Sequence, residues 1–145
     1  MKYILSVLCL VMIAACDKDT GPAHAFAGTW TLNNANENRG GRMVIHDCRN
    51  TTCVVDLDAW ADIYTCELHA KITLTDATNA IHTEQQYVYN FEQQAVVPGP
   101  VGVTFELLAP DKMELDYLNA DTVGEYCGLN ATLTGVWTRQ DKTTD

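Results

Sequence analysis

Residues 64–74, which read YTCELHAKITL, alternate apolar and polar side chains along their whole length. Successive side chains of a β-strand point to opposite faces, so a period of two predicts a strand with one buried and one solvated face. No helical period competes with this alternation in any long window after Gly28. The stretch therefore predicts an all-β fold.

The same alternation continues toward the C-terminus. Residues 101–107 and 113–117 alternate in the same way, and residues 109–112 (APDK) between them favour a turn. These segments predict a hairpin, and residues 129–137 predict the last strand. Less regular strands are expected at residues 29–33, 42–47, 54–58 and 81–91.

About eight consecutive antiparallel strands leave two exposed edges unless the sheet closes on itself. A single small up-and-down barrel is the simplest closure, and an open sandwich is the alternative. The first expected strand begins with Gly28 and Trp30 in a Gly-x-Trp motif, and the last ends in WTR at Arg139. These motifs resemble those of the calycin superfamily, the lipocalin-like and avidin-like barrels. The resemblance implies that Trp30 fills the barrel floor and that Arg139 stacks on its indole.

The N-terminus has the pattern of an export signal. Lys2 is followed by the largely apolar residues 3–15, a run shorter than the roughly 20 residues that a bilayer core requires. Residues 13–15 (IAA) and Cys16 resemble the lipobox of bacterial lipoproteins. The resemblance implies that the signal peptide is cleaved before Cys16, which then carries a diacylglycerol and an N-acyl chain.

The expected domain organisation follows from this signal. We expect a signal peptide over residues 1–15, a lipidated tether over residues 16–27, a barrel domain over residues 28–140 and a tail over residues 141–145. The protein would be lipid-anchored to the inner or outer membrane of the cell envelope, facing the periplasm or the surface.

The charge of the chain limits its partners. Acidic residues number 19 against 9 basic ones, which gives a formal net charge of -10. Such a chain lacks the Lys and Arg that neutralise phosphates, so a nucleic-acid binder is not expected. Anionic lipids would also repel it, so the membrane contact is expected through the N-terminal lipid alone. A cationic protein of the envelope or of a host is the favoured class of partner.

Four cysteines follow the lipobox and allow three pairings. Cys48 and Cys53 flank a four-residue loop, across which facing positions of a hairpin can form a disulfide. That leaves Cys66 to pair with Cys127. A four-cysteine zinc site is the alternative, but the paired Cys-x₂-Cys spacing is absent and an exported chain disfavours free thiolates.

Residues with catalytic potential are few. Serine occurs only as Ser6, inside the signal, so a serine hydrolase is excluded. His82 and Glu84 share one face of a strand, but a metal site would need a third ligand. Asp56, with its acidic neighbours Asp58 and Asp62, is expected in a solvated rim and not in a calcium loop. His46 and His69 fall in separate expected strands. We predict no catalytic residue, no metal site and no cofactor.

The leading functional hypothesis is a non-enzymatic binding module. One alternative is a lysozyme-type inhibitor of cationic muramidases, because small disulfide-stapled β-barrel lipoproteins of bacteria include such inhibitors and resemble this chain in size, export route and the Tyr-Thr-Cys strand. The Ser-Gly-rich inhibitory loop of one such family is absent, and residues 98–100 (PGP) are the nearest exposed candidate.

A second alternative is a carrier of a small apolar ligand. Its cup would be lined by aromatic side chains from several strands: Tyr87, Tyr89, Phe105 and Tyr117. The domain is short for a lipocalin-like barrel, and a short eight-stranded barrel tends to be filled by its own side chains. An enzyme is the third hypothesis, with a cleft around His82 or an acid pair.

Overall fold

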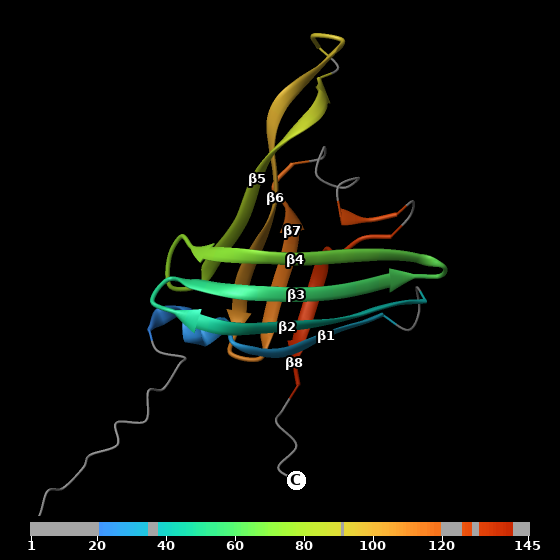
Figure 1. Ribbon diagram of the computed structural model, residues 1–145. Helices are drawn as coiled ribbons and strands as arrows, with labels where there is room; N and C mark the ends of the chain where they lie inside the picture. The colour runs from blue at the N-terminus through green and yellow to red at the C-terminus, as the bar shows by residue number, and fades with distance from the viewer. Residues whose placement is uncertain (1–20, 35–37, 91, 120–125, 129–130, 141–145) are drawn as a thin grey trace, which may run out of the picture.

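The computed structural model describes residues 21–34, 38–90, 92–119, 126–128 and 131–140 (Figure 1). Eight strands, each antiparallel to its neighbours and paired in chain order, close into a barrel in which β8 returns to β1. A short 3₁₀-helix precedes the barrel. The elements are η1 (Pro22–Phe26), β1 (Gly28–Asn34), β2 (Arg39–Arg49), β3 (Thr52–Ala61), β4 (Tyr64–Leu74), β5 (Asn79–Asn90), β6 (Ala95–Ala109), β7 (Lys112–Tyr117) and β8 (Gly135–Arg139).

The all-β class and the closed barrel are confirmed, and the open sandwich is wrong. β4 shows why the strands form, because every second side chain from Cys66 to Ile72 is buried while Glu67, His69 and Lys71 are exposed. The expected strand over residues 129–137 is wrong in its bounds. Among the described residues the last strand is only Gly135–Arg139, since Gly135 has a φ of 130°, which interrupts extended backbone before it.

The barrel closes at two weakly paired corners. β1 and β8 share only the pairs Trp30↔Arg139 and Thr31↔Thr138. β4 and β5 share only two pairs, which end at Thr73↔Ile81. In Figure 1, β2, β3 and β4 run across the view while β6 and β7 run steeply behind them. The barrel therefore consists of two crossed sheets joined by short contacts.

The interior of the barrel holds one hydrophobic cluster that includes both buried tryptophans. Trp30 and Trp137 have no exposed surface. Each indole N–H donates to a main-chain oxygen, that of Phe26 at 3.0 Å and that of Leu133 at 3.1 Å. Because both buried polar groups have partners, the two large side chains fill the core without an unpaired donor.

The floor of the barrel is formed by η1 and Arg139. The guanidinium carbon of Arg139 lies 4.5 Å from the centre of the Trp30 ring, as the calycin resemblance implied, and its Nη2 donates to the oxygen of Ala25 at 2.5 Å. Burial lowers the pKa of Arg139, with the charge of Asp111 opposing the shift. The group closes the floor as a cation held against an aromatic face.

The expectation of an unstructured tether up to residue 27 is wrong for residues 22–26. These residues form η1, and Phe26 is completely buried. Burying a phenylalanine side chain contributes roughly 1.5–3 kcal/mol, which offsets much of the cost of ordering a short turn. The Ala23 N–H also donates to the oxygen of Asn50 at 3.1 Å. The floor thus begins six residues before the first strand expected from the Gly-x-Trp motif.

Both expected disulfides are present. Cys48 and Cys53 are joined across the β2–β3 turn. Cys66 of β4 is joined to Cys127, whose segment runs antiparallel to β4 through an isolated bridge. The Gly128 N–H donates to the oxygen of Thr65 at 2.9 Å, which holds the same segment against β4. The second disulfide therefore fixes the connection between β7 and β8 to the opposite sheet.

Candidate functional site

A two-stranded arm projects from the barrel at the end opposite η1 (Figure 1). β5 leaves β4 after Ile81, and β7 pairs with β6 only as far as the pair Val103↔Tyr117. Beyond these points β5 and β6 continue to pair with each other, from Thr83↔Gly102 to Asn90↔Ala95. We call residues 83–90 and 95–102 the arm.

The arm forms because strand-favouring residues continue past the barrel and end in a defined turn. Its β5 half contains Thr, Tyr and Val, which fit a pleated strand. At the tip the Asn90 side chain accepts a hydrogen bond from the Gln93 N–H at 2.8 Å, and Gln94 adopts a left-handed φ of 48°. The Asn side chain and the left-handed residue together turn the chain back into β6.

One face of the arm, here called the outer face, is open to solvent. It carries Tyr87, which is 77% exposed, and Val96, which is 62% exposed. The same face carries two exposed prolines, Pro98 directly opposite Tyr87 and Pro100 opposite Gln85. An apolar side of this kind on a projecting element is typical of a protein-contact surface.

The opposite face of the arm is held against the molecule. The Glu84 Oε1 accepts hydrogen bonds from the Tyr126 hydroxyl at 2.8 Å and from Gln86 Nε2 at 3.0 Å. These bonds, the Tyr126 bond first, lower the pKa of Glu84. Val101, on the same face, is completely buried. The base of the arm is therefore fixed, which keeps the outer face directed away from the barrel.

Charge distinguishes the arm from the rest of the chain. Within residues 83–102 the only charged side chains are Glu84 and Glu92, in a chain with a net charge of -10. Glu84 is already engaged on the inner side. The outer face is therefore a weakly charged apolar surface on a strongly acidic protein.

His82 lies at the base of the arm. Its Nδ1 is 3.1 Å from the oxygen of Lys71, at the point where β4 and β5 separate. Its Nε2 is 4.0 Å from Glu84 Oε1, and its ring lies 6.3 Å from that of Tyr126. His82 and Glu84 share a face, as expected, but Glu84 is held by other donors. In the described part of the chain, no three His, Cys, Asp or Glu side chains are placed to hold a metal ion.

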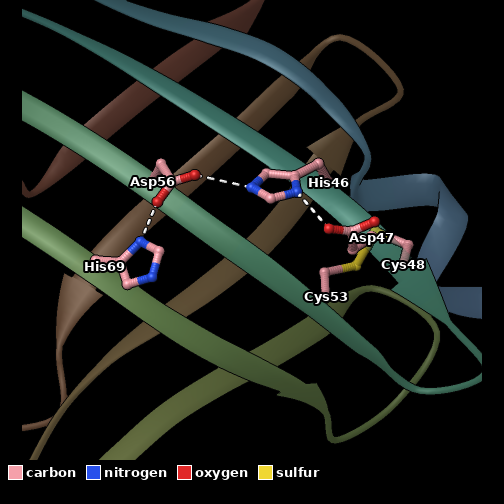
Figure 2. A network of polar contacts seen from close by, with 6 residues as sticks. All are labelled: His46, Asp47, Cys48, Cys53, Asp56 and His69. Atoms are coloured by element: carbon pink, nitrogen blue, oxygen red, sulfur yellow. Dashed lines mark hydrogen bonds and ion pairs between the residues drawn. A yellow bond between two sulfur atoms is a disulfide. The ribbon is translucent and has the colours of Figure 1, made fainter.

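A second polar cluster lies on the outside of β2, β3 and β4 (Figure 2). Asp56 uses one oxygen for His46 Nε2, at 2.8 Å, and the other for His69 Nδ1. Asp47 contacts the remaining ring nitrogen of His46 at 3.0 Å. The hydrogen bond to Asp56 is the largest cause of a raised pKa of His46, and the bond to His46 is the largest cause of a lowered pKa of Asp56.

Sequence reasoning missed this cluster because it depends on strand register. Asp56 stands directly opposite His69, whereas the sequence groups it with its acidic neighbours Asp58 and Asp62. The cluster is solvent-exposed, with the His69 side chain 81% accessible. All the carboxylate oxygens of Asp56 are used by histidines, so the arrangement acts as a cross-strand link on the surface of the sheet.

The residues expected to line an apolar ligand cup are not brought together. Tyr87 is on the exposed outer face, whereas Phe105 is completely buried in the core. The Tyr117 hydroxyl accepts bonds from Thr132 Oγ1 at 3.2 Å and from the Leu133 N–H at 3.3 Å. The side chain of Tyr89 lies outside the described part of the structure, as does Cys16.

A hollow lies at the floor, away from all of these side chains. It measures about 430 Å³ and lies between η1, the β4–β5 turn and the β6–β7 turn. Leu107, Leu108 and Pro110 form its apolar wall, and Arg139 borders it. The floor and the arm tip therefore occupy opposite ends of the β5–β6 hairpin.

Comparison with known proteins gives no relative. No protein-family model matches the sequence, and neither a curated protein nor a solved structure gives a match. No helix in the described ranges is long and apolar enough to cross a membrane.

Proposed function

We propose that the chain is a lipid-anchored, non-enzymatic binding module of the bacterial cell envelope that contacts a partner protein through the outer face of its arm. The observation that carries the proposal is the exposure of Tyr87 and Val96 on a projecting, weakly charged hairpin. Exposed apolar side chains add no burial energy to the protein's own core, whereas a bound partner would bury these side chains away from water.

The placement of the N-terminus supports this arrangement. Cys16 precedes Gly21, the first described residue, by five positions, and five residues span at most about 18 Å. Gly21 adjoins η1 at the floor, and the arm tip lies at the other end of the barrel (Figure 1). A lipid on Cys16 would hold the floor near the bilayer and direct the arm away from it.

The first experiment compares two matched double variants of the chain beginning at Asp17, which retains η1 and every strand. Tyr87→Ser with Val96→Ser removes the apolar outer face of the arm. Leu108→Ser with Val136→Ser is the control, because these side chains are 49% and 45% exposed on the barrel itself. Each immobilised variant is incubated with envelope extract, and every captured protein is quantified.

The proposal expects at least one captured protein to be lost with the arm variant and retained with the control. Equal capture by the arm variant and the unaltered chain would contradict it. Equal loss in both variants would contradict it too, because the contact would then depend on general surface apolarity.

Inhibition of a cationic muramidase is a specific form of the same proposal. The net charge of -10 favours encounter with a cationic enzyme, and the arm supplies the exposed side chains of Pro98 and Pro100. These residues lie within β6, not in a loop as the sequence suggested. The test is muramidase turnover with and without the chain at moderate salt. Inhibition that weakens in the arm variant supports this form, and unchanged turnover removes it.

A further inference from the structure

The two edges of the arm differ in how they are protected from pairing with another strand. On the β6 edge, Pro98 and Pro100 carry no N–H, so two donors of that edge are missing. The Gly102 oxygen on the same edge accepts from the Leu118 N–H at 2.9 Å, and the Pro100 oxygen accepts from Asn119 Nδ2 at 2.7 Å. Proline on an edge strand is a common protection against strand addition.

The β5 edge contains no proline from Thr83 to Tyr87. The alternation of the ladder shows which of its groups point outward: Ile81 pairs with β4, and the Asn79 oxygen accepts from the Thr75 N–H on the same side. Counting on by two, the backbone groups of Thr83, Gln85 and Tyr87 also point away from β6. Among the described residues no ladder partner lies on this edge of the arm.

The sequence of this edge is suited to pairing with itself. In an antiparallel pair centred on Gln85, Gln85 faces its own copy and Thr83 faces Tyr87 of the second copy. Such a two-fold interface uses one surface twice, as most protein dimers do. Of the side chains from Thr83 to Tyr87 only Glu84 is charged, and it is bound on the inner face.

Charge decides between a contact through the arms and a contact through the barrels. Each chain has a net charge of -10, most of it on the barrel, so two barrels would repel each other at short range. Antiparallel arms place the two barrels at opposite ends of the joined strands, so two copies that both carry the Cys16 lipid would be anchored in facing bilayers. The eight arm residues of β5 span roughly 27 Å, several times the Debye length of about 8 Å at physiological salt.

We propose that the outward edge of β5 from Thr83 to Tyr87 joins the same edge of a second copy of this chain, so that two arms form one antiparallel four-stranded sheet. The joined sheet carries two adjacent outer faces, and the apolar surface offered to a partner protein is doubled. Because the contact is one short strand pair, it is a weak interface, with a dissociation constant in roughly the micromolar range.

The test is sedimentation equilibrium of the chain beginning at Asp17 over a wide range of concentrations. The proposal expects a reversible monomer–dimer equilibrium. Gln85→Pro removes the central outward N–H from both copies and raises the dissociation constant about tenfold or more. Gln85→Ala is the matched control, since it keeps the N–H, and its dissociation constant stays within about threefold of the unaltered value.

A second variant protects the test against misfolding. The residue opposite Gln85 in the β5–β6 ladder is Pro100, so the ladder already forms with a proline at this position of one strand. Gln85→Lys keeps every backbone group but brings two cations together on one face, and its dimer is weakened at low salt and partly restored at high salt. A monomer at every concentration would overturn the proposal, as would a Gln85→Pro dissociation constant equal to that of the unaltered chain.

Discussion

Removal of the Cys66–Cys127 disulfide tests the fold more sharply than removal of any single side chain. The bond joins residues 61 positions apart, whereas the Cys48–Cys53 bond joins residues only 5 apart. The two closed loops do not overlap in the sequence. In the chain-entropy model, the loss on breaking a disulfide grows with the logarithm of the loop length.

That model predicts unequal costs for the two bonds. Replacing Cys66 and Cys127 by Ala lowers the free energy of unfolding by about 4 kcal/mol, and the same change at Cys48 and Cys53 lowers it by about 2 kcal/mol. The removed sulfurs do not explain the difference, because Cys66, Cys48 and Cys53 are all buried to a similar degree. The longer bond also holds the segment of Gly128 against Thr65, which adds to its cost.

The assay is equilibrium unfolding in urea of both double variants and the unaltered chain. The midpoint falls in each variant, and the slope rises more in the Cys66→Ala, Cys127→Ala variant because its unfolded chain is more expanded. A short-loop variant that loses as much free energy of unfolding as the long-loop variant would refute the reasoning. So would a long-loop variant with an unchanged midpoint.

Three further predictions concern the floor, the exposed cluster and the arm. Arg139→Ala removes the guanidinium from the buried indole and from the Ala25 oxygen and lowers the free energy of unfolding by about 1–3 kcal/mol, measured by urea unfolding, whereas a change below experimental error would contradict the role of the floor. Asp56 raises the pKa of His46, so the bond between them stabilises the fold fully below the ordinary histidine pKa of about 6.5. This stabilisation is lost at the alkaline end as the pH rises through the raised pKa of His46. It is lost at the acid end as the pH falls through the lowered pKa of Asp56. Asp56→Asn therefore costs more stability near pH 5 than near pH 9, and equal costs at both would show that the ion pair contributes nothing. Replacing Pro98 and Pro100 by Ala restores two donors to the β6 edge and produces species larger than dimers in light scattering, while an unchanged mass would show that the prolines do not protect that edge.

Alternation in the sequence was sufficient to predict the strands, except for the bounds of the last one, and the hairpin that turns at residues 109–112. The contact of Arg139 with Trp30 followed from the calycin resemblance, and the disulfides followed from spacing and elimination. The strands and the turn depend on local sequence, whereas the Arg139–Trp30 contact and the disulfides each depend on one or two residue types with few possible partners. A period of two indicates which side chains share a face of a strand. Because one face of the sheet must be buried, the same pattern predicts which residues form the core.

The arm could not be predicted in the same way. A strand that leaves its neighbour has the same alternation as one that stays paired, so residues 81–91 gave no sign that β5 would leave β4 after Ile81. The cluster around Asp56 required the register of two strand pairs. The 3₁₀-helix was hidden because its buried residues, Ala23 and Phe26, lie three apart in a segment rich in small residues.

Site-specific photo-crosslinking most directly tests the claim that the arm is the contact surface. A photo-reactive amino acid replaces Tyr87 in one chain and Glu114, an exposed residue of β7, in another, and each chain is irradiated in the envelope. The account predicts discrete adducts from position 87 and none from position 114. An adduct with a second copy supports pairing of the arms, and an adduct with another protein supports the proposed binding function. Adducts from position 114 alone, or from neither position, would contradict the account.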